Sequence, residues 1–187
     1  DGILNRLAST RLNLFMLSKN NNKETIDNAL KHVSKIQDIE SEIRDIAHNL
    51  NQDVFRDNTS FTTLLEKLIA NQNQISTTKF ILEMDTTIQW EQIPGSVKMN
   101  FYRIIQEAIH NTNKYAKATK ASISIIPDQN NLCMSITDNG IGFDLNKEKN
   151  GIGIKNMQQR VATLNGKISF DSSINKGTSI YLSVPVM

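Results

Sequence analysis

The sequence lacks the features of membrane-spanning, disulfide-rich and nucleic-acid-binding proteins. Cys133 is the only cysteine in 187 residues, which excludes a disulfide framework and a cysteine-rich metal site and fits a reducing compartment. No apolar run approaches the roughly 18 residues that a membrane helix needs. The net charge is only +2 and the basic residues form no stripe, so direct binding to nucleic acid is not expected. With 39% hydrophobic and 21% charged residues, the composition is that of an ordinary globular protein.

The first third of the chain carries two apolar patterns at helical spacing, separated by the polar segment 18–23. Neither pattern contains proline or, after Gly2, glycine. Two long helices with a short connection form an antiparallel hairpin. Because a lone hairpin cannot bury faces this wide, we expect two copies to pair into a four-helix bundle, which predicts a homodimer. We assign residues 1–55 to this dimerisation region and residues 56–187 to a second domain.

The second domain alternates between helical and strand-like patterns. Helices are predicted at residues 61–74, 97–116 and 154–164. Strands are predicted at residues 79–84, 121–126, 132–137, 167–171 and 178–184. The buried side of the longest helix is predicted to consist of Met99, Tyr102, Ile105, Ala108 and Ile109. The whole pattern predicts an α+β fold, in which the helical hairpin precedes an α/β two-layer sandwich with a mixed or antiparallel sheet.

Polar side chains at helical spacing mark the end of the longest predicted helix. The intervals between them place four residues on one helix face: Glu107, Asn111, Lys114 and Tyr115. An amide oxygen, a carboxylate and an ammonium together suit a magnesium triphosphate, because Mg2+ prefers oxygen ligands and lysine meets phosphate as a point charge. The alternative interpretation is a solvated helix face that binds no ligand.

Two glycine-rich segments follow this helix. Residues 138–143 have the sequence DNGIGF and come directly after a predicted strand. Asp138 at the strand end can accept a hydrogen bond from an exocyclic amine such as that of adenine, and glycine lets the backbone approach a ligand. Alternatively, this segment is only a tight turn. In the second segment, Gly151 and Gly153 precede a predicted helix whose free N–H groups can bind an anion. No Walker A sequence is present there.

Taken in this order, and followed by Lys176, Gly177 and Thr178 before the last strand, these motifs resemble a known family. Residues 61–186 resemble the ATP-binding domain of sensor histidine kinases, whose superfamily includes gyrase-type, Hsp90-type and MutL-type ATPases. The resemblance implies that ATP and Mg2+ are bound. It also implies that residues 145–150 form a mobile lid over the nucleotide.

On the phosphate side of the pocket, the resemblance implies that Asn111 is the Mg2+ ligand and that Glu107 orients metal-bound water. Lys114 would contact phosphate in this family. The two glycines of the second segment, Gly151 and Gly153, would border the phosphates.

On the adenine side, the resemblance implies that Asp138 accepts a hydrogen bond from the adenine amine and that Tyr115 packs beside the ring. Gly140 and Gly142 would shape this side of the pocket. Thr178 would reach the adenine through a water molecule.

The predicted helical hairpin favours histidine kinases over gyrase-type and chaperone-type relatives. Residues 151–166 and 42–50 are similar to the subfamily that works with response regulators bearing helix-turn-helix output domains, so a response regulator receiver domain is the implied partner. In that subfamily, an acidic general base directly follows the phosphoacceptor His. Asp1 is the implied base, the His is expected just before it, and the chain itself is not expected to autophosphorylate. Asn5 occupies the position of a catalytic glutamine for dephosphorylation.

Other interpretations stay open from the sequence. His48 is another candidate nucleophile, but it is followed by Asn49 and has no acidic neighbour on that side. An ATPase of the gyrase or chaperone kind would use Glu107 to activate water, and a nucleotide-binding dimerisation module would have no kinase activity. The chain opens without an initiator Met, so we expect a piece of a longer protein. This portion is expected in the cytoplasm, and its parent is compatible with anchoring in a bacterial inner membrane.

Overall fold

The computed structural model describes residues 9–10, 36, 60–145 and 152–186. The chain divides into two units, Asp1–Asn58 and Thr59–Met187, and the elements below belong to the second. The predicted hairpin of residues 1–55 falls almost entirely outside the described residues, and so do Asp1, Asn5 and His48.

Three α-helices, one π-helix and five strands make up the described part of the second unit. The helices are α3 (Phe61–Ile75), α4 (Gly95–Asn111), η2 (Thr112–Ala116) and α6 (Ile152–Ala162). The strands are β1 (Lys79–Met84), β2 (Lys120–Asp128), β3 (Asn131–Asp138), β4 (Lys167–Ser172) and β5 (Thr178–Pro185). All of the predicted helices and strands of this unit are therefore present, with small shifts at their ends.

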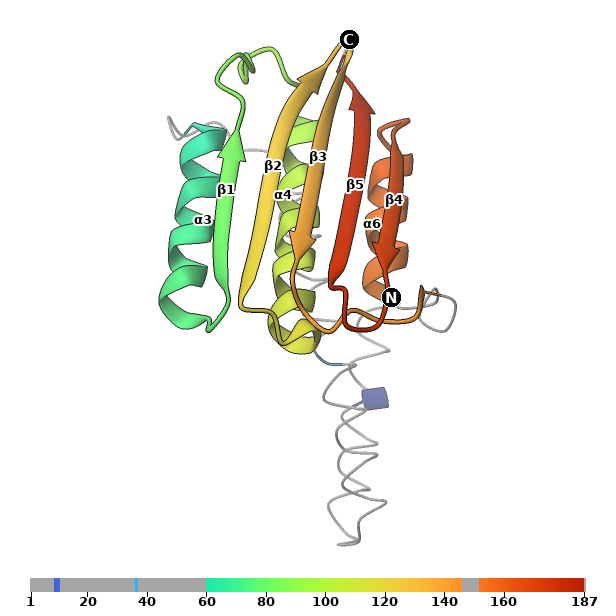
Figure 1. Cartoon of the computed structure of the whole chain (residues 1–187). Helices are drawn as coiled ribbons and strands as arrows, with labels where there is room; N and C mark the ends of the chain where they lie inside the picture. The colour runs from blue at the N-terminus through green and yellow to red at the C-terminus, as the bar shows by residue number, and fades with distance from the viewer. Residues whose placement is uncertain (1–8, 11–35, 37–59, 146–151, 187) are drawn as a thin grey trace, which may run out of the picture. The chain divides into compact units, whose positions relative to one another are not determined.

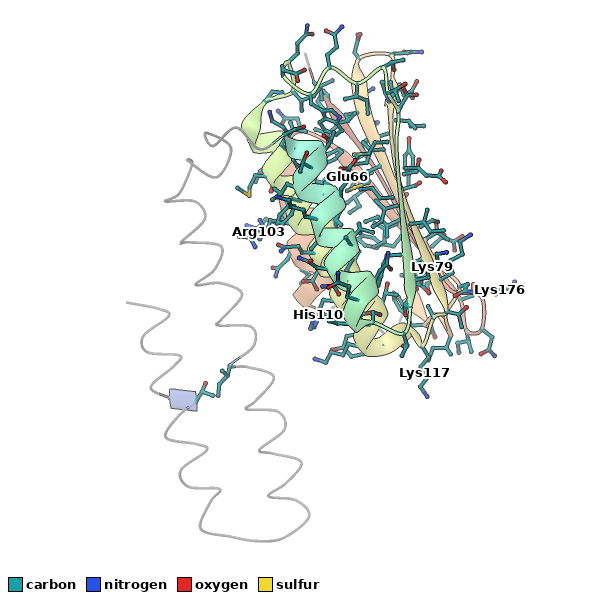
Figure 2. All side chains as sticks on the ribbon, turned by 90° about the vertical axis from the view of Figure 1, so that its left-hand side faces the viewer. Glu66, Lys79, Arg103, His110, Lys117 and Lys176 are labelled. Atoms are coloured by element: carbon teal, nitrogen blue, oxygen red, sulfur yellow. The ribbon has the colours of Figure 1, made fainter. Side chains whose placement is uncertain are left out.

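The five strands form one mixed sheet in the order β1-β2-β3-β5-β4. Only the β1–β2 pair is parallel, and the other three pairs are antiparallel. The three α-helices cover a single face of this sheet (Figures 1 and 2). The second unit is thus a two-layer α+β structure, which confirms the predicted fold class for this part of the chain.

The core lies between the sheet and α4. Along β2, alternate residues Ala121, Ile123 and Ile125 are buried, as expected for a strand that presents one face to helices. On α4, Ile105, Ala108 and Ile109 are buried as predicted, whereas Met99 and Tyr102 are only partly buried. Phe101 and Ile104 are fully buried and were not predicted, because α4 packs with a wider face than a single apolar stripe suggests.

The predicted helix at residues 97–116 is wrong in one respect. It begins two residues earlier, at Gly95, and changes from α-helical to π-helical geometry at Thr112. Lys117 then ends it with a left-handed backbone, φ +50°. The Ala116 carbonyl accepts a hydrogen bond from the Ile141 amide at 2.8 Å, so this end of the helix is joined to a distant loop. Such a tertiary contact cannot be read from helical periodicity.

The topology brings the loops of interest to one end of the sheet. Asp138 at the end of β3 pairs with Thr178 at the start of β5. The start of β2 and the end of η2 lie at the same end (Figure 1). Lys117 and Lys176, which are labelled in Figure 2, belong to the segments that meet there. Residues that are distant in sequence therefore lie together at one end of the two-layer structure.

Candidate nucleotide-binding site

Glu107 and Asn111 form a hydrogen-bonded pair on the last turn of α4. The Asn111 side-chain nitrogen, Nδ2, donates to Glu107 Oε1 at 3.2 Å, and both side chains are partly buried. This bond uses the amide nitrogen, so the amide oxygen keeps its capacity to bind a cation. One amide oxygen beside one carboxylate fits Mg2+, which takes oxygen ligands and keeps several waters. The described residues contain no group of three or more His, Cys, Asp and Glu that could hold a metal.

The start of α6 lies directly against this pair. A Cβ added to Gly153 would overlap Glu107 Oε1 and would lie 3.4 Å from Asn111 Nδ2. Only a residue without a side chain fits here while Glu107 keeps its position. The structure thus joins the asparagine motif to the second glycine motif, whose first glycine, Gly151, is outside the described residues. Free backbone N–H groups at the first turn of α6 can bind phosphate oxygens beside the Glu107–Asn111 pair.

Asp138 provides a buried acceptor at the end of β3. Its side chain is 9% exposed, and its carboxylate oxygen Oδ1 accepts a hydrogen bond from the Gly140 amide at 2.8 Å. Burial raises the pKa of Asp138 above its ordinary value, since desolvation disfavours the charged form. Hydrogen bonds from Gly140 and from the backbone and side chain of Thr178 lower this pKa and partly offset the effect of burial. Asp138 and Thr178, predicted to act on the same base, are thus direct neighbours.

The loop after Asp138 is held by close backbone contacts. Gly142 has φ +56°, and a Cβ there would overlap the Ser173 carbonyl oxygen, so both conformation and space require glycine. Gly140 packs against the Ala116 carbonyl, where a side chain would not fit either. The Asn175 amide also donates to the Ile141 carbonyl at 2.6 Å. The first glycine loop is therefore fixed between the end of η2 and the β4–β5 turn.

Lys114 and Tyr115 lie in the π-helical segment η2, so their place on the face of Glu107 and Asn111 stays a prediction. The spacing argument assumed α-helical geometry, which ends at Asn111. Both side chains are exposed, Tyr115 to 59%, and the Lys114 ammonium lies 5.1 Å from the centre of the Tyr115 ring. They contact each other at the end of the sheet that holds Asp138, and their roles toward phosphate and adenine stay predictions.

Two polar residues that sequence reasoning missed connect the segments of the site. Asn139 Oδ1 accepts hydrogen bonds from the Thr119 amide at 2.9 Å and the Lys120 amide at 3.0 Å, and its Nδ2 donates to the Thr119 hydroxyl. Asn in a D-N-G turn often bonds nearby backbone, so its residue type was a usable signal. Ser172 bonds Gly177 and Thr178 across the β4–β5 turn and Phe143 at the end of the first glycine loop, and it gave no such signal.

A separate hollow of about 360 Å³ lies between α6 and the edge strand β4. Its lining residues are Leu145, Ile154, Gln158, Ile168, Ser169 and Phe170. Apart from Leu145, the first residue of the predicted lid, this hollow contains none of the predicted site residues, and it has no charged side chain that could meet a triphosphate. It therefore does not compete with the Asp138 and Asn111 cluster as a nucleotide site.

Comparison with known proteins agrees with this geometry. Residues 96–187 match the family of histidine kinase-, DNA gyrase B-, and HSP90-like ATPases. The chain is 27% identical over its whole length to the signal transduction histidine-protein kinase/phosphatase DegS of Brevibacillus brevis, of which it covers 49%. It is also 27% identical over its whole length to the oxygen sensor histidine kinase NreB of Staphylococcus carnosus, of which it covers 54%. The chain thus spans about half the length of these relatives.

Two solved structures share the fold. One is the histidine kinase domain of the blue-light activated histidine kinase of Erythrobacter litoralis, with a TM-score of 0.61, 12% identity and coverage of 97% of this chain and 94% of that one. The other is the histidine kinase AdeS of Acinetobacter baumannii, with a TM-score of 0.60, 14% identity and coverage of 97% and 95%.

None of the helices in the described ranges has the length and hydrophobicity to cross a membrane. The fold, the motif order and the family match agree with one another. The match of residues 96–187 to the histidine kinase-, DNA gyrase B-, and HSP90-like ATPase family and the similarity to these histidine kinases therefore support an ATP-binding core of the histidine kinase type.

Proposed function

We propose that this chain is the transmitter core of a sensor histidine kinase in a two-component system. It binds ATP with Mg2+ at the end of the sheet where Asp138 and Asn111 lie. The γ-phosphate is transferred to a His of the dimerisation helix and then to an Asp of a response regulator receiver domain. The relatives named above are described as histidine kinases, which supports the first transfer.

The observation that carries this proposal is that three sequence motifs meet at one end of the sheet. The Glu107–Asn111 pair contacts Gly153 at the start of α6. Asp138 is held at the neighbouring strand end by Gly140 and Thr178. A metal-binding amide, a helix N-terminus and a buried acceptor for an amine match the three chemical parts of ATP–Mg2+.

Each residue has a distinct task in the proposed mechanism. Asn111 would hold Mg2+ through its amide oxygen, and Glu107 would orient water beside it. Bound Mg2+ would supply charge neutralisation for the phosphates. Lys114 adds a positive charge, and the first turn of α6 adds backbone N–H donors at Gly153. Catalysis in this scheme consists of positioning and electrostatic stabilisation, because phosphoryl transfer demands little covalent chemistry from the protein.

On the adenine side, Asp138 accepts the exocyclic amine, and burial strengthens that hydrogen bond because water is excluded. Tyr115 packs beside the base, while Gly140, Gly142 and Thr178 shape the wall around it. The Asp138 carboxylate has to be ionised for this task, since a protonated carboxyl group is a weaker acceptor.

The acceptor half of the reaction is proposed from the family resemblance alone. Asp1 acts as a general base for a His that precedes it, and Asn5 stands at the position that orients water for dephosphorylation. Homodimerisation through residues 1–55 brings the His within reach of an ATP-binding unit.

Binding of ATP to the purified chain, with and without Mg2+, tests the nucleotide site. We expect Asn111→Ala to weaken Mg2+-dependent binding at least about tenfold, because it removes a ligand of the cation. Asn100→Ala is a matched control, since Asn100 lies on the same helix and bonds only to the Ser96 carbonyl among the described contacts. If Mg2+ increases the affinity of wild type and Asn111→Ala equally, the metal assignment is wrong.

Labelling with γ-labelled ATP tests the kinase reaction. We expect no label on the chain as given and stable label on a version carrying a single His before Asp1. Label on His48 would move the nucleophile to the second predicted hairpin helix. Steady phosphate release without any labelled protein would favour an ATPase in which Glu107 activates water.

A further inference from the structure

Four exposed lysines lie around the loop that begins at Asp138. They are Lys79 at the start of β1, Lys117 just after η2, Lys120 at the start of β2 and Lys176 in the β4–β5 turn. These segments meet at the end of the sheet where β3 ends (Figure 1), and three of the four lysines are labelled in Figure 2. We call the four residues the lysine rim.

Backbone contacts join the lysine rim to the proposed adenine acceptor. The Lys120 amide donates to Asn139 Oδ1 at 3.0 Å, and its carbonyl accepts a hydrogen bond from the Asn139 amide at 3.1 Å. Lys176 directly precedes Gly177, where an added Cβ would overlap the Asp138 carbonyl oxygen. The positions of these lysines along the chain are therefore fixed by the same contacts that hold the end of β3.

The charges of the lysine rim are not paired within the described part of the chain. None of the described carboxylates makes an ion pair with any of the four ammonium groups. Lys79 and Lys120 are register partners on neighbouring strands, and like charges at such positions repel each other and do not stabilise the sheet. At this end, the strands contribute two carboxylates against the four lysines, the buried Asp138 and the exposed Asp171.

Charge changes sign along the two strands that begin in the rim. β1 runs from Lys79 to Glu83, and β2 runs from Lys120 to Asp128. Both carboxylates are exposed, and they lie toward the opposite end of the sheet. An anionic ligand that approaches the unit is therefore attracted to the end that holds Asp138 and repelled from the other end of these strands.

We propose that the lysine rim attracts ATP toward its binding site and so raises the rate of association, which rests on the function proposed above. The triphosphate is the anionic part of this ligand. Charges of one sign around a site raise the arrival rate of a ligand of opposite charge, and salt screens the effect. Exposed charges at the edge of a binding site change association far more than dissociation. The four lysines do not contact the bound nucleotide in this scheme.

Two double variants of the full chain test this proposal, because both remove two positive charges. One carries Lys79→Gln and Lys120→Gln in the rim. The matched control carries Lys67→Gln on α3 and Lys167→Gln at the start of β4, where both lysines are exposed and outside the rim. Stopped-flow fluorescence with ATP labelled on the ribose gives association and dissociation rate constants at low and high salt.

At about 0.02 M salt, we expect the rim variant to associate about three- to tenfold more slowly than the control, with dissociation rate constants within about twofold. At about 0.5 M salt, the association rate constants should agree within about 1.5-fold, because the charges are screened. Labelled adenosine, which has no phosphate, should associate equally fast with both variants.

Three results would overturn the proposal. Equal association of ATP with both variants at low salt would show that the position of the lysines is irrelevant. A difference confined to dissociation would mean that the rim contacts the bound nucleotide. A difference that persists at high salt, or that extends to adenosine, would mean that the substitutions distort the site. Should wild type itself fail to bind ATP, the proposed function fails, whatever the variants do.

Discussion

The adenine side and the phosphate side of the proposed site are built in different ways. On the adenine side, the loop after Asp138 is fixed by backbone contacts at Gly140 and Gly142. On the phosphate side, the contacts are between side chains: Asn111 bonds Glu107, and Gly153 leaves room for the Glu107 carboxylate. Backbone contacts cannot yield without moving whole segments, whereas a glutamate side chain can. We therefore expect substitutions on the adenine side to lower the stability of the fold. Substitutions on the phosphate side are expected mainly to weaken ATP binding.

Replacing Gly142 by alanine should have the largest effect. The residue has φ +56°, and its Cβ would overlap the Ser173 carbonyl, so the backbone has to move. We expect a loss of roughly 2 kcal/mol or more in the free energy of unfolding, which lowers Tm by about 5–10 °C. Thermal unfolding followed by circular dichroism measures it.

Gly95→Ala is the control for this variant, because a Cβ there meets no atom within 4 Å. We expect its Tm to stay within about 2 °C of wild type, since an exposed glycine at a helix start contributes little. Equal Tm values for Gly142→Ala and Gly95→Ala would show that the first glycine loop is not held as rigidly as the contacts indicate.

Replacing Asp138 by asparagine should separate binding from stability on the adenine side. ATP affinity is expected to fall about 10- to 100-fold, because a charged acceptor for the amine is lost. The unfolding free energy is expected not to fall, since burial already disfavours the charged form of Asp138. Calorimetric titration and thermal unfolding of the same sample decide this. A large drop in Tm would mean that the ionised carboxylate is needed for folding.

Replacing Gly153 by alanine tests the phosphate side. The added methyl group meets the far end of the Glu107 side chain, which can rotate away, and alanine favours a helix. We expect Tm within about 2 °C of wild type and a loss of about three- to tenfold in Mg2+-dependent ATP binding. A loss of stability as large as that of Gly142→Ala would contradict the difference between the two sides.

The smallest expected effect is a change of base preference with pH. The raised pKa of Asp138 means that its carboxylate takes up a proton at a higher pH than an ordinary aspartate. As the pH falls through that pKa, the free unit gains stability relative to neutral pH, because the neutral form is favoured in the folded state. Adenine binding weakens over the same range, because the ionised acceptor is lost.

The ratio of affinities for ATP and inosine triphosphate isolates this titration, because both ligands have the same triphosphate. A protonated Asp138 can donate to the ring carbonyl of inosine, so the preference for ATP should decline in acid. Asp138→Asn should show no such decline. If this ratio stayed constant as the pH is lowered to the ordinary pKa of aspartate, Asp138 would not be the group that binds the exocyclic amine.

Much of the second unit could be predicted because its elements have strong local patterns. Alternating residues such as Ile123 and Ile125 mark a strand with one buried face, and the order of the motifs led to the family. Contacts between distant segments could not be predicted in the same way. The π-helical segment ends at Ala116, which bonds the distant Ile141, and the bonds of Ser172 to Phe143 and Thr178 form only where the folded chain brings these residues together.

The site residues divide in a similar way. Glu107 and Asn111 could be paired from their spacing, since both lie within α-helical geometry. Lys114 and Tyr115 lie beyond the point where that geometry ends, so the same spacing argument does not reach them and their roles stay predictions. The roles of Asp1, Asn5 and Gly151, and of a lid at residues 145–150, stay predictions because these residues lie wholly or mostly outside the described part of the chain.

The number of residues in the π-helical segment determines how the side chains of that segment are oriented. A π-helical turn holds more residues than an α-helical one, and each residue of an α-helix turns the chain by about 100°. Deleting a single residue between Thr112 and Ala116 would let α-helical geometry continue, but Ala116 would still be tied to Ile141. The side chains of Lys114 and Tyr115 would then be re-aimed without any change in their chemical identity. If Lys114 and Tyr115 have the roles proposed above, insertions and deletions in this short segment would therefore alter nucleotide binding as substitutions do.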